Sequence, residues 1–528
     1  MFWFIAPLAL LGVAALAQDV PPSAGPTSLD DAAWSLVRVD VPDHPDALIS
    51  SRLGSMLAQA PTDGTAFRPV SIPEVDTAYV AWEAVEAMQT DAWIQAGYDG
   101  SGVRVAVFDV QWFNAALRPE ELGDVETWDC GAHDSCELPM DTLRPWHSYE
   151  EGSHGVACAE TIRDLAPGVE LHLVRVNGLT TLENAVGWAI RHDVDLISMS
   201  MSMFSESFYD GTGAVNDLMG DLADAGVLMV TSSGNYADEH WLEDFRDDDM
   251  DGWHEFRGAS EYLPVYLDGG SRSRIMINWD QYHHCGDTDL DAYVWDSAGN
   301  LAGRSEERQI VEDSGCYPSE RVSAYAEKSG WHYLQLRRAA GDPAVRFSIF
   351  ARGSSLYEPM PEGSIADPGT HPSVFTVGAA RATNYIGGEV EYFSSQGPTH
   401  GGLFKPDIVG PDGLSSSVYG ATGFYGTSAS TPAVTAALAI LMSADPELGP
   451  YQAADRLMSY ALTERATFDA PDTARGAGYA RLPPLEVGAR GCGDRPLLLP
   501  VLLWWPLAVF RRRLLSSPPL RSPTRCDP

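Results

Sequence analysis

The 528-residue sequence contains little positive charge. Only two of its basic residues are lysines, Lys328 and Lys405, and 34 basic residues face 74 acidic ones, for a formal net charge of −40. A chain this acidic repels phosphate backbones, which argues against nucleic acid as a partner. Hydrophobic residues still make up 45% of the chain, so a largely disordered or low-complexity protein is excluded. At about 100 to 200 residues per domain, the length allows roughly two to four domains.

The sequence also lacks any CxxC pair, so it gives little support for a zinc site or a thioredoxin-like redox site. Among its seven cysteines are two locally spaced pairs. In an exported chain we expect these pairs to form disulfides, Cys130–Cys136 and Cys285–Cys316. Cys158 lies in an apolar helical pattern and is expected to be a buried thiol.

Positive side chains are missing again at the amino end, where residues 1–17 read MFWFIAPLALLGVAALA. This stretch is apolar, short for a membrane-spanning helix, and ends in a small-x-small pattern, so we interpret it as a signal peptide. An uncleaved anchor is the alternative. Residues 18–80 are rich in Pro, Asp and Ser and are expected to be a pro-segment or linker. The chain is therefore predicted to be exported by bacterial-type secretion to the extracellular space or cell envelope.

Residues 486–528 contain Gly491-Cys492-Gly493, then an apolar run over 497–510, then three arginines. This order resembles the C-terminal sorting tails of some bacterial exported proteins. A weak membrane anchor is the other interpretation, because the run is short for a stable spanning helix. Both interpretations predict membrane or envelope attachment at this end.

Between these ends, near-continuous apolar runs alternate with amphipathic helical patterns. VRVAVFDV, LHLVRV, VDLISMSMS and VLMVTSSGN are expected strands, and LENAVGWAIRH and AVNDLMGDLADAG are expected helices. This alternation predicts βαβ units and a three-layer α/β sandwich with a mostly parallel sheet. The pattern covers residues 81–236 and resumes over 364–485. Residues 237–363 instead show alternating strands separated by turn signals, which predicts an inserted all-β sandwich.

Polar residues with complementary chemistry stand at the expected strand ends and helix starts. Asp109 ends a buried strand, His154 opens a helix, and Ser428 follows a tight turn in GTSAS. A serine hydroxyl needs an imidazole to take its proton, and the imidazole needs a carboxylate to fix its tautomer. Asn235, in the strand-end sequence SSGN, can donate a hydrogen bond to an oxyanion. The order Asp, His, Ser along the chain is that of subtilisin.

The sequence resembles the subtilisin-like serine proteases, the subtilases. GSGVRVAVFD is similar to the family's Asp block, SHGVACAETIRDLAPGVELHLVRV to its His block, TSSGN to its oxyanion block and YGTSASTPAVTAALAIL to its Ser block. The resemblance covers about residues 90–459 apart from the insertion. It implies a triad of Asp109, His154 and Ser428, with Asn235 as the oxyanion donor. It also implies substrate-binding residues, namely Ser200, Met201, Ser202, Ser232, Ser233 and Gly234.

The activity implied is a serine endopeptidase that acts on proteins or peptides through an acyl-enzyme, is made as a zymogen and requires no cofactor. Two other functions stay open. The sequence departs from the family after Asp109, at Val110-Gln111, and after His154, at residues 155–160, which motivates a catalytically impaired homologue acting as a surface binding protein. In the substrate strand, Ser202 stands where glycine is usual. Glu160 motivates a sedolisin-like acid protease, in which glutamate replaces histidine, although His154 and Asn235 favour the subtilisin type.

The start of the insertion carries an acidic turn. DDDMDG has the D-x-D-x-D-G spacing of a calcium loop, but Gly258 stands where a twelfth-position carboxylate is expected. We keep two interpretations, a structural calcium site and a solvated acidic turn. The ligands of the former would be Asp247, Asp249 and Asp251.

A second acidic stretch, DTDLDAYVWD, resembles a strand found in β-sandwich domains of secreted proteases. The alternation places Asp287, Asp289 and Asp291 on one face of that strand. We expect this face to be exposed to solvent rather than to form a ligand set.

Overall fold

A computed structural model describes residues 36–38, 80–131, 135–137, 139–142, 152–282, 286–309, 317–342, 344–464 and 472–485. All but the last of these residues belong to one compact unit, Met1–Pro484. The predicted signal peptide, most of the predicted pro-segment, the tail from residue 486 and the Cys285–Cys316 pair lie outside the described residues.

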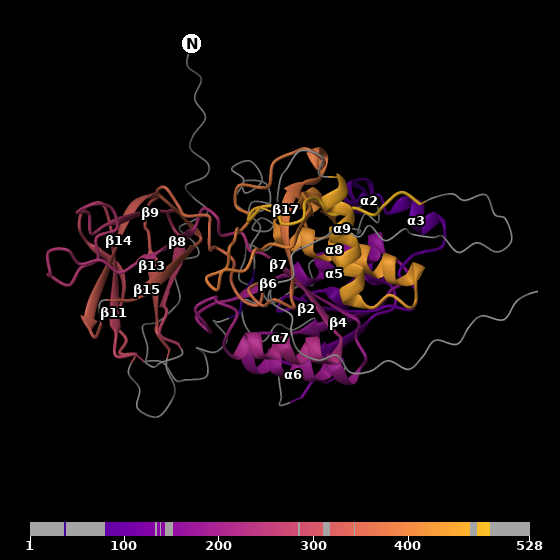
Figure 1. Cartoon of the computed structure of the whole chain (residues 1–528), viewed down its shortest axis with the longest axis horizontal. Coiled ribbons are helices and arrows are strands. Elements are labelled where there is room, and N and C mark those ends of the chain that lie inside the picture. Colours follow the sequence, from indigo (N-terminus) through magenta and orange to yellow (C-terminus); the bar gives the residue numbers. More distant parts are fainter. Residues whose placement is uncertain are drawn as a thin grey trace, which may run out of the picture. The chain divides into compact units, whose positions relative to one another are not determined.

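A parallel sheet of seven strands forms the centre of the α/β part (Figure 1), in the order β18-β17-β7-β5-β2-β4-β3. The strands are β2 (Arg104–Asp109), β3 (Glu126–Asp129), β4 (Glu170–Arg175), β5 (Leu196–Met199), β7 (Leu228–Ser232), β17 (Phe375–Arg381) and β18 (Ile408–Asp412). The inner strands are buried on both faces, as their near-continuous apolar sequences predict. The carboxyl ends of β2 and β7 therefore meet at one edge of the sheet.

Helices cover both faces of this sheet (Figure 1). α5 (His154–Leu165) and α8 (Thr427–Ala444) pack on one face, with α2 (Trp82–Met88) and α9 (Pro450–Glu464) beside α8. α6 (Leu179–Arg191) and α7 (Ala214–Ala225) share an apolar core with the other face. α8 is long and apolar enough to cross a membrane, but 89% of it is buried inside the protein, so it is a core helix. The three layers confirm the predicted fold class.

Short elements complete the α/β part. They are α3 (Asp91–Gln95), η3 (Ala115–Leu117), α4 (Pro119–Leu122), β6 (Met201–Met203), η5 (Ala382–Asn384), β19 (Leu414–Ser416) and β20 (Gly420–Phe424). A strand from the predicted pro-segment, β1 (Leu36–Arg38), pairs antiparallel with β6, with Val37 opposite Ser202. Part of the predicted pro-segment therefore lies against the strand that is expected to bind substrate.

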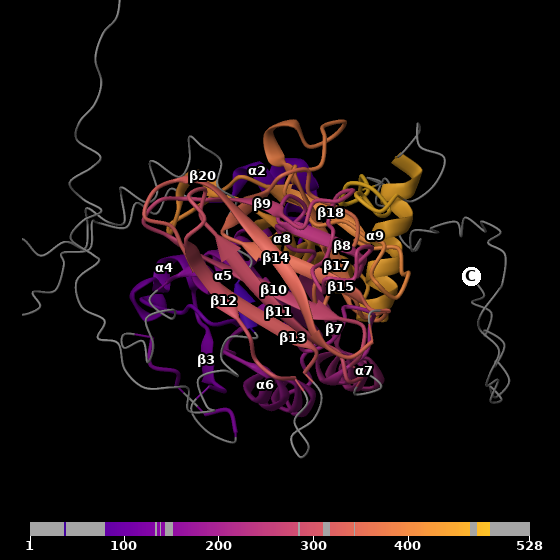
Figure 2. The same ribbon diagram turned by 90° about the vertical axis from the view of Figure 1, so that its left-hand side faces the viewer.

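The insertion forms a sandwich of two antiparallel sheets (Figure 2). One sheet contains β13 (Ser319–Tyr325), β10 (Arg272–Trp279), β15 (Arg346–Arg352) and β8 (His240–Asp244), in that order. The other contains β12 (Leu301–Ser305), β11 (Asp289–Trp295), β14 (Gly330–Ala340), β9 (Leu263–Leu267) and β16 (Ser354–Leu356). Their inward residues form a separate apolar core that includes Trp279, Leu334 and Phe347. All these strands fall within the predicted range 237–363.

A small aromatic cluster joins residues of the insertion to residues of the α/β part. Phe350 and Met276 of the sandwich pack with Phe204, Tyr209 and Tyr236. The side-chain amide of Asn278 also donates a 2.6 Å hydrogen bond to the carbonyl of Ser207. The sandwich is thus anchored just after β6 and just after Asn235.

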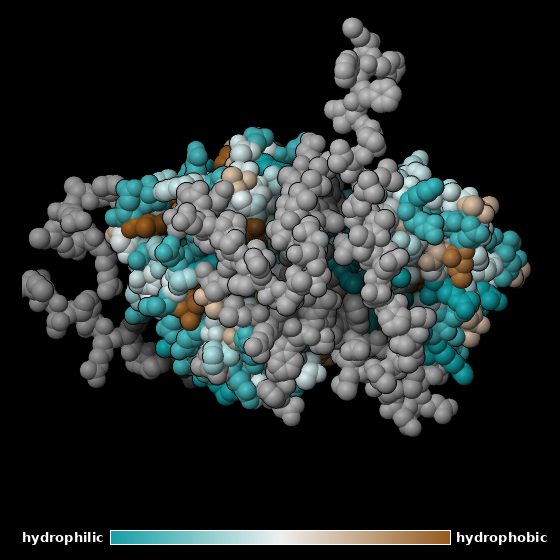
Figure 3. Space-filling model, turned by 180° about the vertical axis from the view of Figure 1, so that it is seen from behind, coloured by the Kyte–Doolittle hydropathy of each residue, from teal (hydrophilic) through white to brown (hydrophobic). Residues whose placement is uncertain are grey.

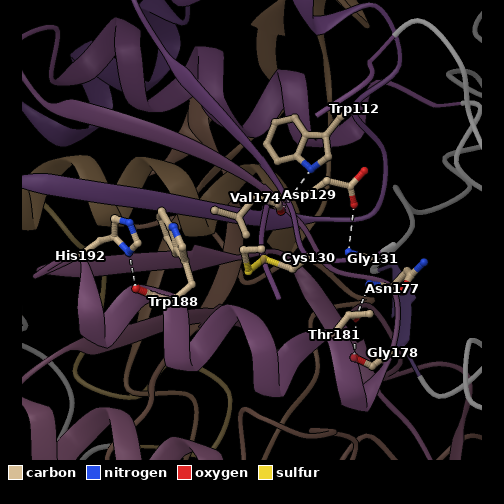
Figure 4. Close-up of a disulfide and its surroundings, with 11 residues drawn as sticks. Trp112, Asp129, Cys130, Gly131, Val174, Asn177, Gly178, Thr181, Trp188 and His192 are labelled. Carbon is tan, nitrogen blue, oxygen red and sulfur yellow. Dashed lines mark hydrogen bonds between the residues drawn. A yellow bond between two sulfur atoms is a disulfide. The ribbon is translucent and has the colours of Figure 1, made fainter. Parts of the chain in front are cut away.

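The loop after β3 contains a disulfide between Cys130 and Cys136. Cys130 is buried with Val174 and Trp188 in the apolar core beneath the sheet (Figure 4). On the face shown in Figure 3, the described surface is mainly hydrophilic and its apolar side chains are scattered, in keeping with the acidic composition.

Candidate active site

Asp109 and His154 form a buried pair. Asp109 ends β2 and His154 opens α5, and both side chains are fully buried. His154 Nδ1 lies 2.5 Å from Asp109 Oδ2. The backbone N–H of Gln111 donates to Asp109 Oδ1 at 2.8 Å, so a main-chain donor supports the carboxylate where the usual hydroxyl is absent. With Nδ1 bonded to the carboxylate, Nε2 is the ring nitrogen that can act as a base.

Gly155 permits this pairing. A Cβ at Gly155 would lie 2.7 Å from the Cβ of Asp109 and 3.0 Å from the ring of Trp112. Real Cβ atoms do not approach this closely, so any larger residue would push α5 away from β2. The Trp112 indole donates to the carbonyls of Asp109, at 2.9 Å, and Val174, at 3.2 Å. These bonds hold the Trp112 ring in place beside Asp109 and Gly155.

Ser428 is the second residue of α8, where backbone N–H groups of the first helical turn favour negative charge. Its carbonyl accepts a 3.0 Å hydrogen bond from Ser200 Oγ. Cys158 Sγ lies 3.8 Å from the same carbonyl and 4.0 Å from His154 Nδ1. The start of α8 is therefore packed against the His154 turn of α5, as a triad requires. Within the described part of the chain, His154 Nε2 is buried and has no hydrogen-bond partner.

Thr427 orients the side chain of Asn235. The Asn235 carbonyl oxygen, Oδ1, accepts hydrogen bonds from Thr427 N–H at 3.0 Å and from Thr427 Oγ1 at 2.9 Å. Because both Thr427 donors bond the same Asn235 atom, that atom is the carbonyl oxygen of the amide. Nδ2 is therefore the end that is left to donate a hydrogen bond. A Cβ at Gly426, whose φ is +99°, would lie 2.7 Å from Nδ2, which explains the glycine there. Sequence reasoning found Asn235 but missed the role of Thr427.

Asp412 is a second residue that sequence reasoning missed. It ends β18, is fully buried, and accepts the Gly426 N–H at 3.0 Å, so it anchors the turn before Ser428. Burial, together with the negative charge of Glu391, raises the pKa of Asp412 above its usual range, and Arg381 partly offsets this. Its only sequence signal is an acidic residue at a strand end, which is common in structural roles.

The predicted substrate-binding residues lie in two adjoining segments. Ser200, Met201 and Ser202 run from the end of β5 into β6, and all three are buried. Ser232 ends β7, and Ser233 and Gly234 follow it and lead to Asn235. The Ser232 and Ser233 hydroxyls are buried without hydrogen-bond partners among the described residues. Both segments thus lead to the region around Ser428.

Glu160 does not take the position of a base. It is 2% exposed and accepts hydrogen bonds from the Ser417 backbone N–H, at 3.0 Å, and from the Ser417 hydroxyl. Arg118 Nε lies 4.0 Å from it. Burial raises the pKa of Glu160 to about 7. Its hydrogen-bond partner, Ser417, lies in the β19–β20 turn, whereas the carboxylate that bonds His154 is Asp109.

The predicted calcium ligands are brought together, with carboxylate oxygens of Asp247, Asp249 and Asp251 within 4.8 Å of one another. Asp249 and Asp251 are exposed, however, and Asp247 already accepts hydrogen bonds from Gly252 N–H and Arg338. An acidic turn can make these hydrogen bonds whether or not it binds an ion, so calcium at this turn stays a prediction.

The sequence profile of the subtilase family matches residues 101–258 and 292–478. The chain belongs to the subtilase family. The matched ranges of this subtilase include Asp109, His154, Asn235 and Ser428, and the unmatched stretch between them falls inside the insertion. The resemblance expected from the sequence is confirmed.

Relatives and solved structures agree with this family. The subtilase is 23% identical over 433 residues to minor extracellular protease Vpr of Bacillus subtilis (strain 168), covering 74% of this chain and 52% of Vpr. It is 36% identical over 139 residues to bacillopeptidase F of the same organism, covering 25% of this chain and 9% of that protein. The chain thus spans about half or less of these relatives. The structure of the Clostridium perfringens CspB protease has the same fold, with a TM-score of 0.51, 16% identity, and coverage of 76% of this chain and 97% of that one.

Proposed function

We propose that this subtilase is an exported serine endopeptidase that hydrolyses peptide bonds through an acyl-enzyme. The observation that carries the proposal is the buried His154–Asp109 hydrogen bond beside the start of α8, where Ser428 stands. His154 Nε2 takes the Ser428 proton as the hydroxyl attacks the scissile carbonyl, and it then protonates the leaving amine. Water hydrolyses the acyl-enzyme by the same route.

The oxyanion of each tetrahedral intermediate is held by Asn235 Nδ2 and by backbone N–H groups at the start of α8. Thr427 supports this role because it fixes Asn235 Oδ1 before substrate binds. A donor held in place beforehand stabilises developing charge without reorganising in the transition state.

The substrate is proposed to be a protein or peptide that binds as an extended strand. β1 supports this mode, since an extended segment already pairs antiparallel with β6 at Ser202. Main-chain hydrogen bonds of such a pair give affinity with little dependence on side chains. Because β1 uses the same strand edge, we propose that the segment before the core keeps the enzyme a zymogen until it is displaced or cleaved.

Export is proposed on two grounds. The relative with the longer match is named an extracellular protease. The Cys130–Cys136 disulfide also suits an oxidising compartment. The predicted signal peptide is consistent with both.

Two alternatives are less well supported by the geometry. An impaired homologue would lack support for Asp109, yet the Gln111 N–H supplies it. An acid protease would place Glu160 against the nucleophile, yet Glu160 bonds Ser417. Neither alternative accounts for the His154–Asp109 pair.

Hydrolysis of a chromogenic peptide amide by the processed, purified enzyme tests the proposal. We expect activity near neutral pH that falls on acidification, as a histidine base becomes protonated. Ser428→Ala and His154→Ala should each lower kcat by at least about 10⁴-fold, with Glu120→Gln, a surface carboxylate, as the matched control. An acid optimum that survives His154→Ala would overturn the mechanism.

A further inference from the structure

Three carboxylates from both sheets of the inserted sandwich converge at one point. Asp289 and Asp291 come from β11 of one sheet, and Glu320 comes from β13 of the other. One oxygen of each lies within 4.8 Å of the others. Two oxygens bound to one calcium ion at about 2.4 Å can be up to about 4.8 Å apart, so the spacing suits a shared ion.

Burial makes this cluster different from a surface acidic patch. Glu320 is 1% exposed and Asp291 is 9% exposed. The expectation that this face of β11 is open to solvent is therefore wrong at Asp291, although Asp287 is exposed. Buried carboxylates are normally paired with a cation or coordinate a metal.

No side-chain cation is close enough to pair with the cluster. Among the described residues, none of the three carboxylates has a Lys, Arg or His partner within 4.0 Å. Arg308 and Arg337 act on Asp289 and Asp291 only from a greater distance. Among the described residues, three carboxylates thus meet at one largely buried point without a side-chain cation in contact.

The hydrogen bonds leave oxygens of the cluster unused. Glu320 Oε1 accepts from the Glu307 N–H at 3.0 Å and from the Gln309 amide at 2.6 Å, and the Ser305 hydroxyl also acts on this carboxylate. Among the described residues, Glu320 Oε2 is buried and has no partner at hydrogen-bond distance. In the described part of the chain, Asp289 Oδ1 is likewise buried without a partner, although the Gln309 backbone N–H acts on the same carboxylate. The ladder shifts register between Asp289 and Leu290, which re-aims the Asp289 side chain. A buried oxygen without a partner has lost its hydrogen bonds to water, and a bound cation would replace that lost interaction.

The directions of the pKa shifts agree with a cation shared by the three carboxylates. Burial raises the pKa of Glu320 to about 7, and burial also raises the pKa of Asp289. Burial and the charge of Asp289 raise the pKa of Asp291. Without a cation the three groups resist ionising together, whereas a divalent cation would favour the ionised form of all three.

We propose that Asp289, Asp291 and Glu320 bind a calcium ion that connects the two sheets of the inserted sandwich. A set of three carboxylates is typical of calcium, whereas magnesium usually keeps several waters and takes one or two carboxylates. The site is separate from the Asp247–Asp251 turn and from the triad. Its role is to stabilise the insertion, and peptide-bond hydrolysis does not pass through it.

Terbium luminescence and thermal unfolding test the site in the full chain carrying Ser428→Ala, which prevents self-digestion. Tyr293 Oη lies 3.3 Å from Asp291 Oδ2, so Tyr293 is placed to sensitise a terbium ion bound there. Terbium is titrated into chelator-treated protein, calcium or magnesium is then added as competitor, and Tm is measured with calcium and with EDTA. The test variants are Glu320→Gln and Asp291→Asn, and Asp247→Asn is the matched control at the other acidic turn.

We expect saturable terbium emission that calcium displaces more readily than magnesium, and a Tm at least about 2 °C higher in calcium than in EDTA. Glu320→Gln and Asp291→Asn should weaken calcium binding at the sandwich site at least about tenfold, whereas Asp247→Asn, which alters only the other acidic turn, should leave binding at the sandwich site unchanged. In EDTA, Glu320→Gln should melt at the parent temperature or higher, because it removes a buried charge. The proposal fails if calcium leaves Tm unchanged, or if only Asp247→Asn abolishes the calcium effect.

Discussion

Replacing Thr427 with valine isolates the contribution of one hydrogen bond to catalysis. Valine keeps the shape of threonine and the backbone N–H that bonds Asn235 Oδ1 at 3.0 Å, but it removes the hydroxyl that bonds the same oxygen at 2.9 Å. A neutral hydrogen bond inside a protein contributes about 0.5–1.5 kcal/mol. At about 1.4 kcal/mol per tenfold in rate, kcat should fall about 2- to 12-fold.

The effect must act through Asn235 if the geometry is right. Asn235→Ala, which removes the donor itself, should lower kcat about 10²- to 10³-fold. In that background Thr427→Val should change kcat less than about twofold, since no amide is left to orient. Thr427→Ser, which restores the hydroxyl, should recover most of the activity.

Steady-state hydrolysis of a peptide amide measures these values, and KM should stay near that of the parent because the loss appears in the transition state. Equal losses from Thr427→Val with and without Asn235 would refute the positioning role. Full activity of Thr427→Val would refute it as well.

Three further predictions follow from buried contacts. Gly155→Ala should lower kcat/KM at least about 10²-fold, because its Cβ would meet Asp109 at 2.7 Å; parent-like activity would show that α5 can shift freely. Burial raises the pKa of Glu160 from 4.5 to about 7, so the stability it contributes is full below about pH 4.5 and is lost as the pH rises through 7. Relative to the parent, Glu160→Gln should therefore gain up to about 3 kcal/mol in unfolding free energy between pH 5 and pH 8, measured by urea unfolding of an inactive variant, and a flat difference would contradict this. A synthetic peptide of residues 30–45 should inhibit the processed enzyme competitively, and Val37→Pro should weaken it about tenfold by removing a strand donor; equal potency would place the peptide elsewhere.

The sequence predicts the α/β part well because its candidate catalytic residues stand at the ends of clearly patterned strands and at the starts of helices. Asp109 and Asn235 follow apolar runs that can only be buried strands, and His154 and Ser428 open helices beside them. The carboxyl ends of parallel strands meet at one edge, so the residue types, their order and the resemblance to the subtilases together predict one shared site at that edge.

The supporting contacts could not be predicted in the same way. Thr427 orients Asn235, which lies 192 residues away along the chain, and Asp412 anchors Gly426, which lies 14 residues away across a strand pair and a turn. The donor that supports Asp109 is the backbone N–H of Gln111, which any residue type except proline would provide. The side chain of residue 111 therefore carries no sequence signal for this main-chain hydrogen bond.

The insertion was predicted as a sandwich from four runs, SRIMINWD, DLDAYVWD, GWHYLQLRR and AVRFSIFAR, which match β10, β11, β14 and β15, so its other strands were missed. β12 reads LAGRS, which has a central glycine and little apolar alternation, and it forms by pairing with β11. Glu320 sits in β13, a polar stretch that sequence reasoning did not assign as a strand. Its approach to Asp289 and Asp291 depends on how the two sheets pack, so the carboxylate cluster was not foreseen.

Labelling with a serine-reactive fluorophosphonate tests the central claim most directly. The processed protein is treated near neutral pH, and the Ser428→Ala variant is the control. Labelling of the parent that disappears in the variant is the predicted result, since it requires a hydroxyl activated by His154 and a working oxyanion site. A folded, processed protein that stays unlabelled at both neutral and acid pH would contradict the claim that the triad is assembled for catalysis.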